Sequence, residues 1–127
     1  MKPRSAKNKG QRLSKELRSR LLESAPQLEP DDIIVTPSGV PGEDLRLSPK
    51  ARQVYPLSFE CKNTEKLQLW PAIEQAEANS GGYITAVVFK KNNKVPHIVM
   101  KLTDFLELTY GKTENSNIHG KAEQKED

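Results

Sequence analysis

The sequence predicts one α/β domain in which helices flank a mixed β-sheet. Helical periodicity marks residues 11–24 and 71–79, and strand patterns fill the chain between and after these segments. Alternating helices and strands are typical of helices packed on the faces of a sheet. A chain of 127 residues with 35% hydrophobic residues is sufficient for one small core.

The first elements follow from local patterns. Leu13, Leu17 and Leu21 recur every fourth residue and predict an amphipathic helix over 11–24. Two prolines follow it, and the β-branched run at 32–36 then predicts a strand. The later elements are predicted in this order: a glycine-rich loop at 37–42, a polar loop at 49–54, a strand at 55–62, a helix at 71–79 with Pro71 in its first turn, strands at 83–89 and 95–102 joined by a tight turn, and a short helix at 103–108.

Charge distinguishes the two ends of the chain. The first twenty residues carry eight Lys or Arg against Glu16 alone, which suits a polyanionic partner such as nucleic acid. We expect residues 1–10 to be a disordered basic arm, 11–110 to be the domain, and 111–127 to be a disordered polar tail.

Several function classes are disfavoured by composition. The single Cys61 cannot form an internal disulfide, and with only two histidines it cannot complete a zinc site. The sequence has no apolar run of membrane-spanning length and no hydrophobic leader, so we expect a cytoplasmic protein with no membrane partner.

The strand at 55–62 carries the most informative motif. Alternation places Leu57, Phe59 and Cys61 on one apolar face, whereas Glu60 and Lys62 share the other face near the strand end. A salt bridge is the simpler interpretation of this pair. Roughly two acid-x-Lys triplets are expected by chance in a chain of this composition, so the motif depends on its context.

Asp44 supplies that context. Fifteen residues separate it from Glu60, and a turn between neighbouring strands can bring both carboxylates to one sheet edge. Together with the backbone carbonyl of Cys61, they are hard oxygen ligands suited to Mg²⁺ or Mn²⁺. Lys62 would orient a nucleophile and add positive charge, which predicts metal-assisted hydrolysis of phosphodiesters.

These residues resemble the PD-(D/E)xK nuclease superfamily and, within it, the Holliday-junction-resolvase-like endonucleases common in bacteriophages. The resemblance covers about residues 10–108. Its matching elements are a first helix with an acid, Glu16, the loop-to-strand motif Gly42-Glu43-Asp44, the strand end Glu60-Cys61-Lys62, and a following helix with Gln75.

The resemblance implies a restriction-endonuclease-like core and a set of roles. Asp44 and Glu60 would be metal ligands, Lys62 the catalytic lysine, Glu16 an accessory acid, and Gln75 a supporting residue. The implied activity is Mg²⁺- or Mn²⁺-dependent cleavage of branched DNA during recombination, in the host cytoplasm if the protein is viral. Paired cuts at a junction also imply a homodimer.

Alternatives remain at each level. Another nuclease, acting on nicks, ends, flaps or a specific site, would use the same residues, and a non-catalytic DNA-binding module would use only the basic end. Asp31 or Glu43 could replace Asp44 as the ligand, because no proline directly precedes Asp44. Glu16 could instead form a surface ion pair with Arg12 or Arg20, one turn away on either side.

Other side chains are candidates for DNA contact. Trp70 could stack on a base, but packing on the sheet is the favoured interpretation. The residues predicted to bind DNA are Lys7, Lys9, Arg12, Ser38, Lys50, Arg52 and Lys66.

Overall fold

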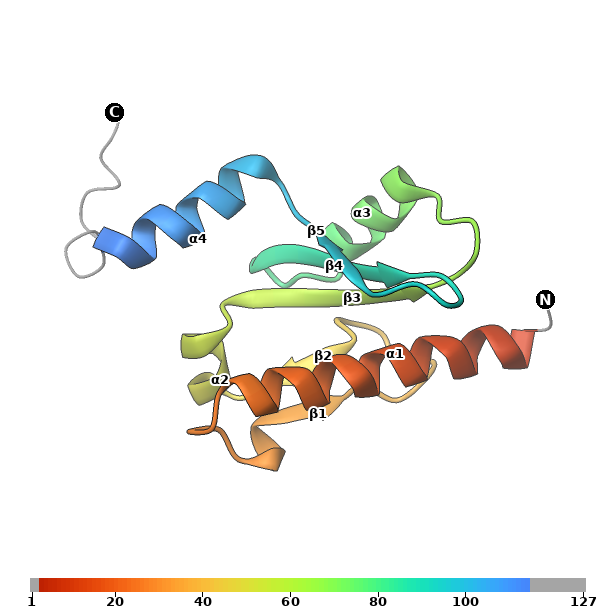
Figure 1. Cartoon of the computed structure of the whole chain (residues 1–127), viewed down its shortest axis with the longest axis horizontal. Helices are drawn as coiled ribbons and strands as arrows, with labels where there is room; N and C mark the ends of the chain where they lie inside the picture. The colour runs from red at the N-terminus through yellow and green to blue at the C-terminus, as the bar shows by residue number, and fades with distance from the viewer. Residues whose placement is uncertain (1–2, 115–127) are drawn as a thin grey trace.

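The computed structural model describes the backbone of residues 3–114 and the side chains of residues 7–110. Within that part of the chain, no helix combines the length and apolarity needed to span a membrane. The elements in chain order are α1 Pro3–Ser24, the 3₁₀ turn η1 Pro30–Asp32, β1 Ile33–Val35, β2 Leu45–Leu47, α2 Pro49–Val54, β3 Leu57–Asn63, α3 Leu69–Ala78, β4 Ile84–Lys90, β5 His97–Val99 and α4 Leu102–Glu114 (Figure 1).

The predicted mixed sheet is confirmed. Its strand order is β3-β4-β5, with β3 and β4 parallel and β4 and β5 antiparallel. A separate antiparallel ribbon of β1 and β2 is joined to the edge of β3 by one backbone hydrogen bond, from Asp44 N to Phe59 O at 3.0 Å. The ribbon therefore approaches the sheet beside the predicted site.

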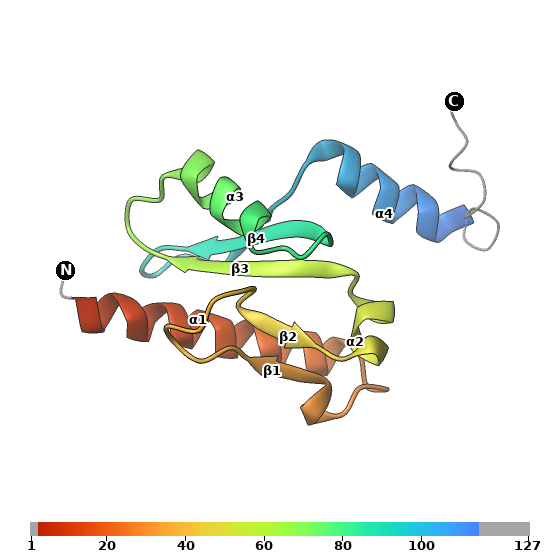
Figure 2. The same cartoon turned by 180° about the vertical axis from the view of Figure 1, so that it is seen from behind.

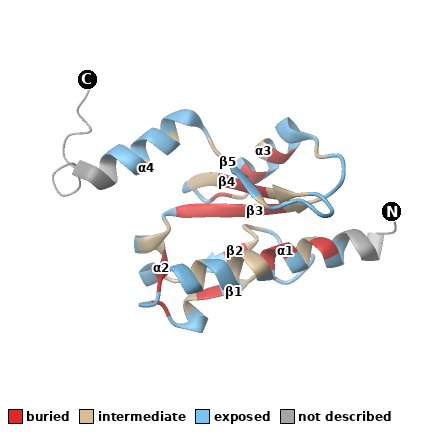
Figure 3. Ribbon diagram, in the orientation of Figure 1, coloured by how far each residue is buried: buried red, intermediate tan, exposed pale blue. Residues whose placement is uncertain are grey.

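The core is divided by the sheet. On the α1 side, Leu13, Ile33, Leu45 and Phe59 belong to one large buried cluster. On the α3 side, the buried cluster contains only Ala72, Ala76 and Val87. Figure 3 shows β3 buried along most of its length, whereas α4 is largely exposed.

The predicted disordered arm is wrong for residues 3–10, because α1 begins at Pro3. Lys9 is buried in this helix, and its carbonyl accepts a hydrogen bond of 3.1 Å from Asn63 Nδ2 at the end of β3. This tertiary contact extends the helix beyond its leucine stripe. At the other end, α4 continues to Glu114 past the predicted stop at 108, so the first residues of the predicted tail 111–127 are helical, and the tail from residue 115 lies outside the described residues.

The polar segment at 49–54, predicted as a loop, is the helix α2. Ser48 is its N-cap, with Oγ accepting a hydrogen bond of 3.0 Å from Ala51 N, and Pro49 occupies the first helical position. Both are ordinary helix-start signals, since the cap satisfies a free N–H and the proline ring already has a helical φ. The buried Ala51 then anchors the helix on the core.

Candidate active site

Backbone contacts place Asp44 at the edge of β3. Gly42 has φ +109°, a conformation that favours glycine, and it turns the chain immediately before the site. Thr36 holds the returning segment, donating from N to Asp44 O at 2.9 Å and from Oγ1 to Glu43 O at 2.7 Å. The side chain of Asp44 is thereby brought to β3.

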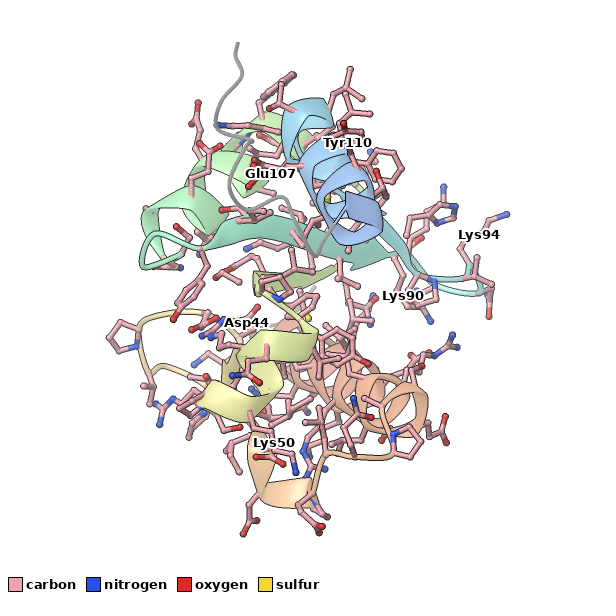
Figure 4. The ribbon with its side chains drawn as sticks, turned by 90° about the vertical axis from the view of Figure 1, so that its left-hand side faces the viewer. Asp44, Lys50, Lys90, Lys94, Glu107 and Tyr110 are labelled. Atoms are coloured by element: carbon pink, nitrogen blue, oxygen red, sulfur yellow. The ribbon has the colours of Figure 1, made fainter. Side chains whose placement is uncertain are left out.

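The Asp44 carboxylate contacts the middle of β3 directly. Its Oδ2 accepts a hydrogen bond of 2.6 Å from Cys61 N. Because the N–H and C=O of one residue point to the same edge of a strand, the Cys61 carbonyl also faces Asp44. Figure 4 shows Asp44 between the ribbon of α2 and the three-stranded sheet. The carboxylate and the carbonyl predicted as ligands thus share one edge.

Glu60 is the second carboxylate and is 4% exposed. Burial raises its pKa, the charge of Asp44 raises it further, and the side chains of Lys62 and Asn79 oppose the shift. Burial likewise raises the pKa of Asp44, against the opposing effects of the Cys61 N–H and Lys62. Two neighbouring carboxyl groups that both resist ionisation form a site that would gain from a cation.

Lys62 lies beside Glu60, as the strand alternation predicts. Its Nζ is 3.6 Å from Glu60 Oε2 and donates a hydrogen bond of 2.5 Å to Gln75 Oε1 of α3. The two contacts hold the ammonium group near the carboxylates while the side chain remains partly exposed. Gln75 is therefore part of the same cluster.

The donor set fits a hard divalent cation. Asp44, Glu60 and the Cys61 carbonyl offer oxygen atoms only, and Glu60 Oε1 is a buried atom with no hydrogen-bond partner among the described residues. Among those residues, no group of three or more His, Cys, Asp or Glu side chains converges. A cation held by this set would keep several waters, as Mg²⁺ commonly does.

Glu16 is not gathered with the two carboxylates. It forms an ion pair of 2.9 Å with Arg20, one turn along α1, as the alternative interpretation predicted. The pair is largely exposed, so it contributes only a few tenths of a kcal/mol to stability.

The two rivals of Asp44 lie elsewhere. Glu43 forms a mostly buried ion pair with Arg52, and Asp31 is exposed in η1. Only Asp44 contacts the backbone of β3 beside Glu60. The structure thus favours Asp44 as the carboxylate of the site.

Arg52 was predicted to bind DNA, and that prediction conflicts with its position inside the protein. Besides Glu43, its guanidinium donates to Leu57 O at 2.6 Å and lies 4.0 Å from the centre of the Tyr83 ring. Arg52 therefore ties the residue before Asp44 to the starts of β3 and β4. No sequence motif marks this role, since its partners are distant in the chain.

Lys9 is the second DNA-binding candidate that the structure corrects. Its side chain is buried, and its Nζ lies 4.0 Å from Glu65 without a hydrogen bond. Burial against Asn63 and Glu65 removes it from the surface. The other candidates are all exposed: Lys7, Arg12, Ser38, Lys50 and Lys66.

The lysines labelled in Figure 4 lie on different sides of the molecule. In Figure 4, Lys50 lies on α2 below Asp44, whereas Lys90 and Lys94 lie on the opposite side of the view. Lys50 is thus on the Asp44 side of the molecule in this view.

The Cys61 thiol points into the core on the α1 side. Burial raises its pKa to about 12, although the Ser14 side chain opposes the shift. A thiol held in this protonated form is a poor nucleophile. Only the backbone of Cys61 therefore belongs to the site.

The fold thus gathers Asp44, Glu60, Lys62 and Gln75, and it leaves Glu16 on the surface of α1. Comparison of the chain with protein-family models, curated proteins and solved structures finds no match.

Proposed function

We propose that the protein is a Mg²⁺- or Mn²⁺-dependent endodeoxyribonuclease that hydrolyses phosphodiester bonds in branched DNA. One observation carries the proposal: a buried and a partly buried carboxylate, Glu60 and Asp44, both have raised pKa values and lie beside a lysine at a single strand edge. Such an arrangement is costly for folding, because burial penalises the charged forms. Groups held at this cost are candidates for a functional site.

Each residue has a chemical role in this proposal. Asp44, Glu60 and the Cys61 carbonyl would hold the cation, which, when bound, supplies Lewis-acid stabilisation of the phosphate and acidifies water. Lys62 donates to the attacking water or to a phosphate oxygen and offsets negative charge that develops in the transition state. Gln75 accepts a hydrogen bond from Lys62 Nζ and so keeps the ammonium group in position.

The finer parts of the proposal concern substrate and assembly. Branched DNA follows from the resemblance to junction resolvases, as do a role in recombination and a cytoplasmic location. Two coordinated cuts require two active sites and hence a homodimer. Exposed basic residues, among them Lys7, Arg12, Lys50 and Lys66, would contact phosphates, which predicts salt-sensitive DNA binding.

The test is cleavage of a labelled four-way junction and of its linear duplex arms, with Mg²⁺, with Mn²⁺ and with EDTA. Wild type should cut the junction symmetrically, and Lys62→Ala should lower the cleavage rate by about 100-fold or more. Lys91→Ala, which removes an exposed lysine just after β4, is the matched control and should retain the wild-type rate.

The outcomes separate the candidate functions. Equal cutting of junction and duplex would replace the resolvase with a general nuclease, and preference for nicked or flapped DNA would name another target. Salt-dependent binding without cleavage in either metal would indicate a non-catalytic DNA-binding module. Full activity of Lys62→Ala would refute the proposed site.

A further inference from the structure

Helix α4 carries an apolar stripe on its exposed surface. Leu102, Phe105 and Leu106 are 71%, 50% and 50% exposed. Their spacing of i, i+3 and i+4 places them on one side of the helix. Glu107 falls on the opposite side, so the helix is amphipathic. An amphipathic helix normally buries its apolar face against another element.

Among the described side chains of α4, one packs against the large core cluster. Leu108 contacts the large core cluster, together with Met100 just before the helix. Figures 1 and 2 show α4 leaving the end of β5 and extending away from the sheet. The stripe therefore lies outside the fold of its own chain.

A groove of about 810 Å³ begins where α4 begins, between α3, β4 and the first turn of α4. Its apolar lining includes Leu69, Trp70 and Ile73 of α3. Trp70 is 70% exposed, so the expectation that it packs on the sheet is wrong. Within its own chain, α4 cannot turn back to fill this groove, because its first residues form one wall and the helix then runs away from it.

We propose that a second copy of this chain docks on the α4 surface, defined by Leu102, Phe105 and Leu106 of α4 and by Leu69, Trp70 and Ile73 of the groove. One chain carries both an apolar helix face and an apolar groove that the helix does not fill. Two copies related by a two-fold axis cover both at once, as an isologous interface does.

The charge of the groove disfavours DNA as its occupant. Glu74, Glu77 and Asp104 line it, and Lys101 is its one basic lining residue. A polyanion would be repelled there, since DNA binding relies on Lys and Arg contacts to phosphate. The α4 surface is thus suited to an apolar protein partner.

The available area is compatible with a dimer. A fully accessible aromatic side chain offers about 150–250 Å². At their observed exposures, Trp70 and Phe105 together offer roughly 240 Å² on that basis. The leucines, Ile73 and the neighbouring backbone add to this and bring the contact towards the ~800 Å² per partner of a typical stable interface.

A dimer formed through the α4 surface would supply the two active sites that paired cuts need. This functional meaning of the dimer rests on the proposed function. The α4 surface involves neither DNA nor a metal, so the test omits both. The full chain is studied by sedimentation equilibrium in EDTA between about 1 and 100 μM. Wild type should be a dimer in this range.

Paired variants assign the interface. Phe105→Glu, in the stripe, should weaken dimerisation by about 100-fold or more, whereas Ser19→Glu, which adds the same charge at an exposed position of α1, should leave it unchanged. Circular dichroism checks that both variants keep the wild-type fold, as their exposed positions predict. A monomeric wild type would overturn the inference and point to another protein as the occupant, as would a dimer that Phe105→Glu leaves intact.

A cross-linking experiment provides an independent measurement. Cys61 is the one native cysteine and is buried, so Leu106→Cys introduces the single accessible thiol. A short bis-maleimide should yield a covalent dimer from Leu106→Cys and none from Ser19→Cys, which places the thiol at an exposed position of α1. Equal yields would contradict the assignment. A dimer that fails to cut DNA would refute the proposed function and leave the dimer interface standing. A monomer that cuts DNA would refute the dimer interface and leave the nuclease activity standing.

Discussion

The two faces of β3 differ sharply in what they bury. Towards α1, Leu57, Phe59 and Cys61 join the large apolar cluster. Towards α3, Glu60 and Lys62 share the space beside a helix that buries only alanines against the sheet. The same seven-residue strand therefore serves packing on one face and chemistry on the other.

This division has a physical basis. Apolar burial stabilises by about 25 cal/mol per Å², and the α1 side holds most of the buried apolar side chains. Burying Glu60 and Asp44 costs free energy, as their raised pKa values indicate. The strand β3 can hold these carboxylates because apolar packing on its other face stabilises it. Three kinds of substitution would test this difference between the two faces.

The largest expected effect is on the α1 face. Leu13 is fully buried in the large cluster, and Leu13→Ala should lower the free energy of unfolding by about 2–5 kcal/mol. Ile73→Ala on α3 is the matched change, and its partly exposed side chain predicts a smaller loss. Urea denaturation monitored by circular dichroism measures both. Equal losses would show that the two faces contribute alike.

The second prediction concerns Arg52, which contacts the start of β3. Arg52→Ala leaves Glu43 buried without its partner and should cost about 3 kcal/mol of stability. Lys50→Ala, two residues earlier and exposed, should change it by less than about 0.5 kcal/mol. The same denaturation measurement applies. If Arg52→Ala kept full stability but lost DNA affinity, its original assignment to DNA binding would be restored.

The smallest effect, of opposite sign, is expected on the α3 face. Glu60→Gln removes a charge that burial penalises, so at pH 7 it should raise the free energy of unfolding by about 0.5–2 kcal/mol, the usual range of stabilising substitutions. Cleavage should be lost in the same variant. A variant less stable than wild type at pH 7 would mean that the interactions of Glu60 outweigh its burial cost.

The pH dependence of the free energy of unfolding also tests the raised pKa of Glu60. Because the folded pKa of Glu60 is raised above its ordinary 4.5, folding favours the protonated form, and stability falls as pH rises through the folded value. The lowered pKa of Asp32 acts oppositely, since its contribution is lost as pH falls below about 3.8. Denaturation curves in EDTA should therefore show the stability gain of Glu60→Gln over wild type growing from pH 4 to pH 7. A gain that stays constant with pH would show that the Glu60 pKa is not raised.

Local patterns predicted much of the site and the fold. The leucine repeat predicted α1, the alternation along β3 placed Glu60 beside Lys62, and the glycine-rich loop led to Asp44. The signals for α2, Ser48 and Pro49, are local as well, whereas the polar composition of 49–54 favours a loop. Each of these features depends on neighbours a few residues apart, which is the range over which propensity and periodicity act.

Contacts between distant residues could not be anticipated. The charges of Lys9 and Arg52 suggested DNA contact, yet Asn63, Glu43 and Tyr83 surround them inside the protein. Glu16 had the chemistry of an accessory acid, but its place on α1 pairs it with Arg20. Residue type and spacing thus specify the helices, the strand faces and the candidate chemistry. Burial, ion-pair partners and the exposed stripe of α4 depend on how elements far apart in the chain pack together, because solvent access is a property of the assembled fold.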